Sequence, residues 1–474
     1  MCFRFRRYDL LNLQVRLKME KHHQNIQLLA EAPIRKVLWK FFLPAFTGVV
    51  VNSLYNIVDR IFVGQGVGVL ALTGLSVVFP IMIIMMAFGM LIGMGSGVRI
   101  SIFLGKKDFA SAEKVLGNAF SLMIITSIVL TIVGFIIKEP LLRLFGASDD
   151  TIGYANEYLN IILFGTMFHM VGFSMNNMIR AEGNARIAMF SMLISAGTNI
   201  VLDPIFIFVF GMGVQGVAWA TIISNFILCV WVINHFRSQY SVIKLRASNF
   251  RLKRSIVISI VTIGFSPFAM QFAASFVQGL FNIQLIKHGG DLAVGAMGII
   301  NSVATLVVMS IIAINMAAQP IYGFNHGAGN FVRVKRTLFI CLKAAVIVSI
   351  VGFALMELFP SLVIKMFNAR DAELLAIGKR GLRIFMAGLP VVGFQIIVGN
   401  YFQSTGKAAI SALMSLLRQV IVLIPILIFL PTICGVNGVW VSAPISDFIA
   451  GIIAFTFITR EIRRLNKAIN QGAG

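Results

Sequence analysis

The sequence predicts an all-α polytopic membrane protein, and three observations support this fold class. Of the 474 residues, 58% are hydrophobic and only 12% are charged, whereas soluble domains have about 45–50% and 25%. Twelve apolar stretches recur between Phe41 and Phe457, each of about 20 residues, which is long enough to cross about 30 Å of hydrocarbon. The run 120–137 is almost continuously apolar, whereas membrane strands are about ten residues long and alternate apolar with polar positions.

The twelve spans can be followed in order along the chain by where each apolar run stops. They end near residues 64, 98, 137, 180, 210, 235, 286, 320, 359, 403, 430 and 458. With these ends, the tails and the loops after even-numbered spans hold roughly 29 Lys and Arg, and the opposite loops hold roughly seven. The bias places both termini in the cytoplasm of a plasma-membrane protein. It also accounts for the formal net charge of +22 without a nucleic-acid partner.

The two halves of the chain form an internal repeat. Each half has six predicted spans, an even number, so both halves start on the same side and are related by an axis along the membrane normal. Repeats of this kind form two lobes with a substrate path, which is typical of transporters. Residues of the two halves match at a shift of 222 or 223: Pro44 with Pro267, Gly105 with Gly327, Phe109 with Phe331, Gly165 with Gly388, Gly183 with Gly406, and Gly216 with Gly438.

We therefore expect five segments. Between the lobes lies a basic cytoplasmic linker, and the first tail contains Met19, which we treat as an alternative start because it leads directly into the first span. The four cysteines are far apart, which argues against disulfides or a zinc site. The expected segments are a cytoplasmic tail at 1–36, an N-lobe at 37–236, the linker at 237–255, a C-lobe at 256–458 and a cytoplasmic tail at 459–474.

Three carboxyl groups lie well inside predicted spans, namely Asp59, Asp203 and Asp447. The other acidic residues fall in tails, loops or span ends, where we expect them to be solvated. A carboxylate inside the hydrocarbon region is costly unless it is paired, hydrated or protonated, so each of the three is a functional candidate. The alternative is a passive role in helix-to-helix hydrogen bonding, and for Asp447 this alternative is the stronger one.

Depth separates these three candidates. Asp59 lies about 18 residues into the first span and Asp203 about 16 into the fifth, which corresponds to roughly 27 and 24 Å of helix rise. At one depth in the N-lobe, two carboxyl groups are suited to sharing a proton. Tyr55 and Asn199 each lie one turn before one of the aspartates on the same helix face, and Pro204 removes a backbone hydrogen bond beside Asp203.

Three motifs in this order resemble the multidrug and toxic compound extrusion (MATE) family of efflux transporters. They are NSLYNIVDRIFVG, IRAEGNARIAM, and NIVLDPIFIF followed by GVQGVAWAT, and the resemblance extends over about residues 33–460. It implies twelve helices in two six-helix bundles. In the proton-coupled, DinF-like branch, the positions matching Asp59, Asn199 and Asp203 form a proton or cation site. The same resemblance implies that Tyr55, Asn176 and Thr221 belong to the polar network around it.

The sodium-coupled, NorM-like branch uses acidic residues in the C-lobe, including one in the seventh span, but the seventh span here has none. This difference favours coupling in the N-lobe. It does not choose between H+ and Na+, because Asp59, Asn199, Asp203 and Thr221 offer oxygen ligands to either ion. Asp447 matches no family site and stays a second acidic candidate.

The sequence thus predicts a secondary active antiporter that exports organic, cationic amphiphilic drugs or toxins in exchange for H+ or Na+. We expect a monomer in the lipid bilayer with small-molecule substrates, no cofactor and no enzymatic activity. One alternative is a flippase for lipid-linked precursors, whose phosphates would need several basic residues facing the substrate; Arg99, Lys343, Arg383 and Arg418 are the candidates. A membrane-embedded enzyme is a further alternative, but the sequence has no HExxH motif.

Overall fold

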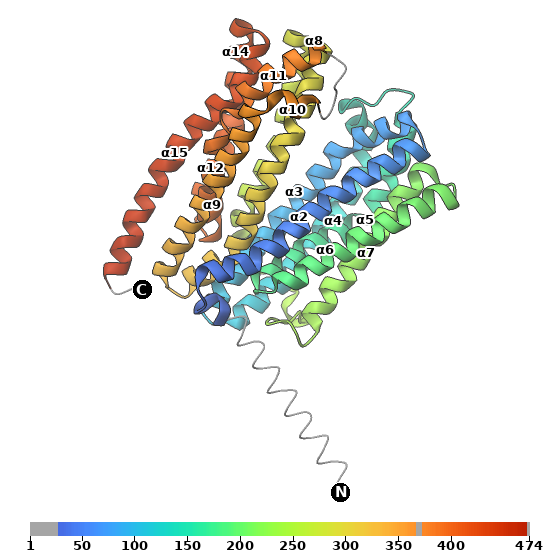
Figure 1. Cartoon of the computed structure of the whole chain (residues 1–474). Helices are drawn as coiled ribbons and strands as arrows, with labels where there is room; N and C mark the ends of the chain where they lie inside the picture. Colours follow the sequence, from blue (N-terminus) through green and yellow to red (C-terminus); the bar gives the residue numbers. More distant parts are fainter. Residues whose placement is uncertain (1–26, 366–371, 472–474) are drawn as a thin grey trace. The chain divides into compact units, whose positions relative to one another are not determined.

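A computed structural model describes residues 27–365 and 372–471, without the side chains at positions 52, 55–57, 60, 69, 291 and 372. The alternative start at Met19 lies outside the described residues. Within these ranges every regular element is a helix, and Figure 1 traces them in chain order. The backbone has few other ways to satisfy its polar groups in a bilayer, since only helices and closed barrels do so within the lipid.

The first half of the chain forms six long helices. Pro204 ends α6, where the chain continues into a π-helical turn, η1, at Ile205–Val209. The bounds of the six helices are α2 Ile34–Gly66, α3 Val69–Gly105, α4 Phe109–Leu144, α5 Ile152–Ala181, α6 Ala185–Pro204 and α7 Gly213–Arg237.

The second half follows after a short 3-10 turn, η2, at Ala247–Asn249. Its first two spans, Arg254–Gly290 and Leu292–Gly327, are joined into α8, with Gly290 at the positive φ of 66° that a glycine adopts without strain. A second π-helical turn, η3, lies at Leu417–Val422. The bounds are α8 Arg254–Gly327, α9 Phe331–Leu358, α10 Pro360–Lys365, α11 Ala372–Met386, α12 Leu389–Ser404, α13 Ala408–Leu416, α14 Leu423–Cys434 and α15 Val436–Asn470.

Ten of these helices or helix segments are long and apolar enough to cross a membrane, among the described residues. The pair α11 and α12, which is bent by 43°, makes an eleventh span if it is counted as one. Helix α2, of 33 residues, contains the first predicted span. The predicted fold class, an all-α polytopic membrane protein with twelve transmembrane helices in two bundles, is confirmed.

The chain divides into two compact units. One contains the residues up to Val261 together with Gly323–Ala328, and the other contains Thr262–Tyr322 and Gly329–Gly474. In the first unit α3 and α7 each pack along α5, and α2 packs along α6; in the second, α9 packs along α12 and α14 along α15. Small residues allow these close approaches, as at Gly93, where an added Cβ would lie 2.7 Å from the Cα of Ser174.

Within the first unit, the ends of α3 and α8 touch backbone to backbone. A Cβ added at Gly105 would overlap the carbonyl oxygen of Phe324, and a Cβ added at Gly327 would overlap that of Ile102. The contact is therefore available only to glycine at both positions, because any side chain would push the two helix ends apart.

Each of these helix ends leads into a turn whose last residue caps the next helix. Asp108 precedes α4 and accepts a hydrogen bond from the backbone amide of Ser111 at 3.0 Å, and Asn330 precedes α9 and accepts one from the amide of Arg333 at 3.1 Å. Both satisfy a helix N–H group that has no partner within its own helix. Hydrogen bonds from the side chain and the backbone of Ser111 lower the pKa of Asp108 below its ordinary value of 3.8.

Candidate functional site

The structure brings Asp59, Asn199 and Asp203 together inside the N-lobe. Asp59 lies on α2 and the other two on α6, one turn apart, and these helices pack along each other. All three side chains are buried. The Asp59 carboxyl group interacts directly with that of Asp203, and Asn199 Nδ2 donates a hydrogen bond to Asp203 Oδ1 at 3.3 Å.

Not every oxygen of this group has a partner. Asn199 Oδ1 and Asp203 Oδ2 are buried and, among the described residues, accept no hydrogen bond. Buried polar atoms without a partner are uncommon and are usually satisfied by water or an ion. The site thus combines two carboxyl groups with an amide oxygen that is available as a ligand.

The remaining residues of the predicted network are placed differently. Asn176, on α5, donates to the carbonyl of Ala188 at 2.8 Å and to Ser191 Oγ at 2.6 Å, so it ties α5 to α6 rather than contacting either carboxyl group. Thr221, on α7, is buried, and its carbonyl accepts a hydrogen bond from the Ser224 hydroxyl. The side chain of Tyr55 lies outside the described residues.

Pro204 changes the helix directly beside Asp203. After the proline, α6 widens into η1, where the amide of Phe210 bonds to the carbonyl of Ile205, five residues earlier. A proline has no N–H group to continue the regular ladder, and single π-helical turns inside α-helices are frequent at functional sites. The carboxyl group of Asp203 therefore lies at a local break of its helix.

The C-lobe does not repeat this arrangement. The segment NIVLDPIFIF at 199–208 aligns with VIVLIPILIF at 420–429, so Val420 and Ile424 occupy the positions of Asn199 and Asp203. In place of a carboxyl pair, the C-lobe has an ion pair between two helices: Arg418 Nε on η3 contacts Asp447 Oδ1 on α15 at 2.7 Å. Asp447 thus has a basic partner on another helix, which the sequence alone did not identify.

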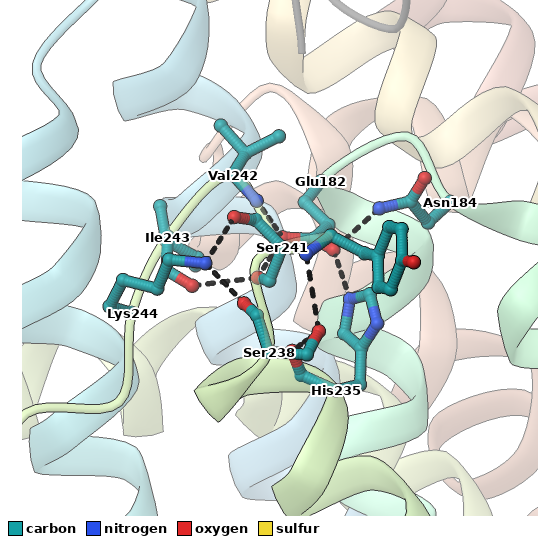
Figure 2. A network of polar contacts seen from close by, with 9 residues as sticks. Glu182, Asn184, His235, Ser238, Ser241, Val242, Ile243 and Lys244 are labelled. Atoms are coloured by element: carbon teal, nitrogen blue, oxygen red, sulfur yellow. Dashed lines mark hydrogen bonds and ion pairs between the residues drawn. The ribbon is translucent and has the colours of Figure 1, made fainter. Parts of the chain in front are cut away.

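A further buried acidic residue, which the sequence predicts to be solvated, lies at the end of α5. That expectation is wrong for Glu182, which is 1% exposed. As Figure 2 shows, its Oε1 accepts hydrogen bonds from His235 Nε2 and from Asn184 Nδ2, while its Oε2 accepts them from Ser241 Oγ at 2.7 Å and from the Val242 amide at 3.1 Å. A carboxylate with this many donors is stable without water.

This network anchors the basic linker to the N-lobe. Ser241 and Ile243 are fully buried, and the Lys244 ammonium group donates to the carbonyls of Ser238 and Ser241. Further along, α4 holds the linker through side chains that bond to its backbone. Glu113 accepts from the Lys244 amide at 3.0 Å, Asn118 accepts from the Lys253 amide at 2.6 Å and donates to the Asn249 carbonyl at 3.1 Å, and Ser121 donates to the Phe250 carbonyl at 2.7 Å.

The C-lobe has a similar buried contact at the matching turn, but there the residue in the turn, Lys407, is basic and its partner on α15 is acidic. Glu461, also expected to be solvated, is 8% exposed; it accepts a hydrogen bond from the Tyr401 hydroxyl at 3.1 Å and forms an ion pair with Lys407. Glu182 and Glu461 are therefore both buried at places where the ends of helices contact one another. No group of three His, Cys, Asp or Glu side chains is arranged to hold a metal ion in residues 27–365 and 372–471.

Comparison with known proteins identifies the family. The family model described as MatE matches the chain twice, at residues 44–205 and at 267–428, once in each half. Among curated proteins, the chain is 25% identical over 433 residues to the multidrug export protein MepA of Staphylococcus haemolyticus, covering 91% of this chain and 95% of that one. It is 24% identical over 437 residues to MepA of Staphylococcus aureus, covering 92% and 96%.

Solved structures agree with this assignment. One described as the outward-facing conformation of a multidrug resistance MATE family transporter has a TM-score of 0.86 at 25% identity, covering 94% of this chain and 99% of that one. A MOP superfamily transporter from Pyrococcus furiosus, at 24% identity, shares the fold with a TM-score of 0.87, covering 93% and 98%. With the double family match, these likenesses establish that the chain belongs to the MATE family of membrane transporters.

Proposed function

We propose that the chain is a secondary active antiporter that exports organic, cationic amphiphilic compounds across the plasma membrane in exchange for protons. The observation that carries this proposal is the buried contact between Asp59 and Asp203 next to Asn199. Two carboxyl groups in a buried contact cannot both carry a negative charge at low cost, so the site is suited to bind and release a proton. The MepA relatives, which are named multidrug export proteins, support drug-like substrates.

The proton gradient is an adequate energy source for such a cycle. One elementary charge moving through 100 mV releases about 2.3 kcal/mol, and a tenfold concentration gradient corresponds to about 1.4 kcal/mol. Na+ is the second candidate ion, because Asn199 Oδ1 and the two carboxyl groups are oxygen ligands of the kind that hard cations prefer. We also propose that the protein is a monomer and that both of its termini lie in the cytoplasm. The second proposal is supported by the basic residues in the tails and linker.

The flippase alternative is weaker. A lipid-linked pyrophosphate needs several basic side chains whose positive charge is not already balanced, but acidic partners balance the charge of two of the four basic candidates. Arg383 pairs with Glu357 at 3.3 Å and Arg418 with Asp447 at 2.7 Å.

The test is dye efflux from proteoliposomes under an imposed proton gradient or an imposed sodium gradient. Asp59→Asn and Asp203→Asn should each reduce efflux at least tenfold without loss of folding, as judged by size-exclusion profile and circular dichroism. Asp149→Asn is the matched control, because Asp149 is 89% exposed and pairs only at the surface with Arg143. Efflux that is driven by the sodium gradient alone would show that Na+, rather than H+, is the coupling ion. Normal efflux in both variants would refute the coupling site.

A further inference from the structure

A charged pair lies near the middle of the C-lobe. Arg418 is about 10 residues after the start of α13 and Asp447 about 11 after the start of α15, which corresponds to roughly 15 and 17 Å of helix rise from the two opposite membrane faces. Its side chains are unequally covered, since that of Arg418 is 32% exposed and that of Asp447 is 8% exposed. Charged side chains at this depth face protein or water rather than lipid.

The ion pair is not the only contact between these two helices, because Ser446 Oγ on α15 also donates a hydrogen bond to Arg418 O at 2.6 Å. ISNF at 223–226 aligns with ISDF at 445–448, so Asn225 of the N-lobe corresponds to Asp447. The N-lobe also has a serine hydroxyl bonded to a backbone carbonyl of the facing helix, since Ser195 Oγ on α6 donates to Ser224 O on α7 at 3.2 Å. The two lobes differ in which helix donates, and the N-lobe makes its hydrogen bond between neutral residues.

Asp447 is fixed from several sides. Its backbone carbonyl accepts a hydrogen bond from Gln395 Nε2, and its Oδ2 lies where a side chain on Gly388 would be, 2.5 Å from an added Cβ. Asp447 in turn holds Arg418 through Nε alone. In the part of the chain that the structure describes, the two terminal nitrogens of this guanidinium donate no hydrogen bond to protein.

The free edge of Arg418 thus presents paired N–H donors with the geometry that binds a carboxylate in a bidentate manner. Because Asp447 already balances the charge of Arg418, a ligand that brings both a carboxylate and its own cation leaves the site neutral. A pyrophosphate, with several negative charges and a single guanidinium to meet them, does not.

We propose that Arg418, oriented by Asp447, binds the carboxylate of zwitterionic amphiphiles during export. This inference rests on the export function proposed above and extends it to a second substrate class, bound in the C-lobe rather than at the N-lobe carboxyl pair. Arg418 is the binding residue and Asp447 is the positioning residue.

The test uses a matched pair of dyes, rhodamine B, which carries a carboxylate, and its methyl ester, which does not. The variant combines Arg418→Ser with Asp447→Asn, which removes both charges together and leaves no unpaired charge. In proteoliposomes the KM for rhodamine B efflux should rise at least tenfold, while efflux of the ester stays within twofold of the unmodified chain. Arg418→Lys, which keeps the charge but loses the planar fork, should give an intermediate KM for rhodamine B.

The control variant combines Arg143→Ser with Asp149→Asn, an exposed pair of the same chemistry, and should leave both dyes unaffected. Equal losses for both dyes in the Arg418 and Asp447 variant would show a structural role and overturn the proposal. So would unchanged transport of rhodamine B, or a parent chain that exports only the ester. If the parent chain exports neither dye while remaining folded, the proposed export function itself fails, and this substrate site with it.

Discussion

Gly105 and Gly327 occupy equivalent positions of the two repeats and form the two halves of one contact, in which each helix end rests on the backbone of the other. Their contact partners are equivalent as well, because Ile102 and Phe324 are related by the same shift of 222 residues. The contact is thus reciprocal, because each glycine lies against the carbonyl group three residues before the other glycine.

The first prediction concerns this contact between the ends of α3 and α8. Gly327→Ala should lower the melting temperature of the protein in detergent by several degrees, because overpacking typically costs about 1–3 kcal/mol and the obstructing atom is a backbone carbonyl that does not rotate away. Gly298→Ala is the control, since Gly298 is helical and exposed with nothing within 4 Å of an added Cβ. It should leave stability unchanged or raise it by about 0.5–1 kcal/mol. Equal melting temperatures for the two variants would contradict the close contact.

The second prediction concerns Glu182. Glu182→Ala removes the shared acceptor of His235, Ser241 and Val242. Each buried donor left without a partner costs about 1–3 kcal/mol, so we expect the free energy of unfolding to fall by about 3 kcal/mol or more. Denaturant or thermal unfolding in detergent measures this change. Limited proteolysis should also cut the linker faster in the variant.

The surface pair provides the comparison for this experiment. Asp149→Asn should change the unfolding free energy by no more than about 1 kcal/mol, since exposed ion pairs contribute little. A Glu182→Ala variant as stable and as protease-resistant as Asp149→Asn would mean that the linker is not held by this network.

The third prediction concerns the reversed charges at the two related helix ends. Glu182 and Lys407 lie in matching turns, on either side of Gly183 and Gly406, yet one is acidic and the other is basic. We expect Lys407→Met to destabilise the protein strongly, because it leaves the Glu461 carboxylate buried without its cation. Adding Glu461→Gln to Lys407→Met should recover a large part of the loss. A double-mutant cycle measures this coupling, and strictly additive effects would argue against a direct ion pair.

The fourth prediction concerns the pH dependence of the cap on α4. The pKa of Asp108 is lower in the folded protein than its ordinary value of 3.8 because Ser111 donates hydrogen bonds to the charged form. A group of this kind stabilises the fold above its unfolded pKa, and the contribution is lost as pH falls through the folded pKa. Asp108→Asn should therefore melt below the parent at pH 7. The difference should begin to narrow below about pH 4 and should vanish only below the lowered pKa of the folded protein.

Asn330 is the uncharged equivalent of this cap. Asn330→Ala should lower the melting temperature by the same amount at pH 7 and at acid pH. A gap between the parent and Asp108→Asn that does not depend on pH would show that the charge of Asp108 contributes nothing to the cap.

The helices and their membrane character follow directly from the sequence, because apolar runs of 20 residues have few alternatives. The same reasoning identifies Asp59 and Asp203, since a carboxyl group inside such a run stands out. This reasoning from sequence fails at Glu182, because the segment RAEGNAR has the pattern of a polar, solvated turn. Burial there depends on a linker more than 50 residues later folding back over it, and no local pattern records that contact.

A similar limit applies to pairs of side chains. Arg418 and Asp447 are 29 residues apart on different helices, and their contact depends on helix rotation, which hydropathy does not define. Asn176 illustrates the converse, because the family resemblance implies that it belongs to the network around the carboxyl groups, whereas its amide bonds to Ala188 and Ser191.

The anchored linker also constrains how the chain can vary. Apart from the Ser241 hydroxyl, the linker groups that Glu182 and Asn118 contact are backbone groups of Val242, Asn249 and Lys253, so these contacts depend on position along the loop rather than on side-chain identity. Substitutions that preserve the number of residues between these anchors keep the backbone bonds, whereas one inserted or deleted residue moves a different amide or carbonyl into each place. Among related chains, this loop should therefore vary more in composition, Ser241 excepted, than in length.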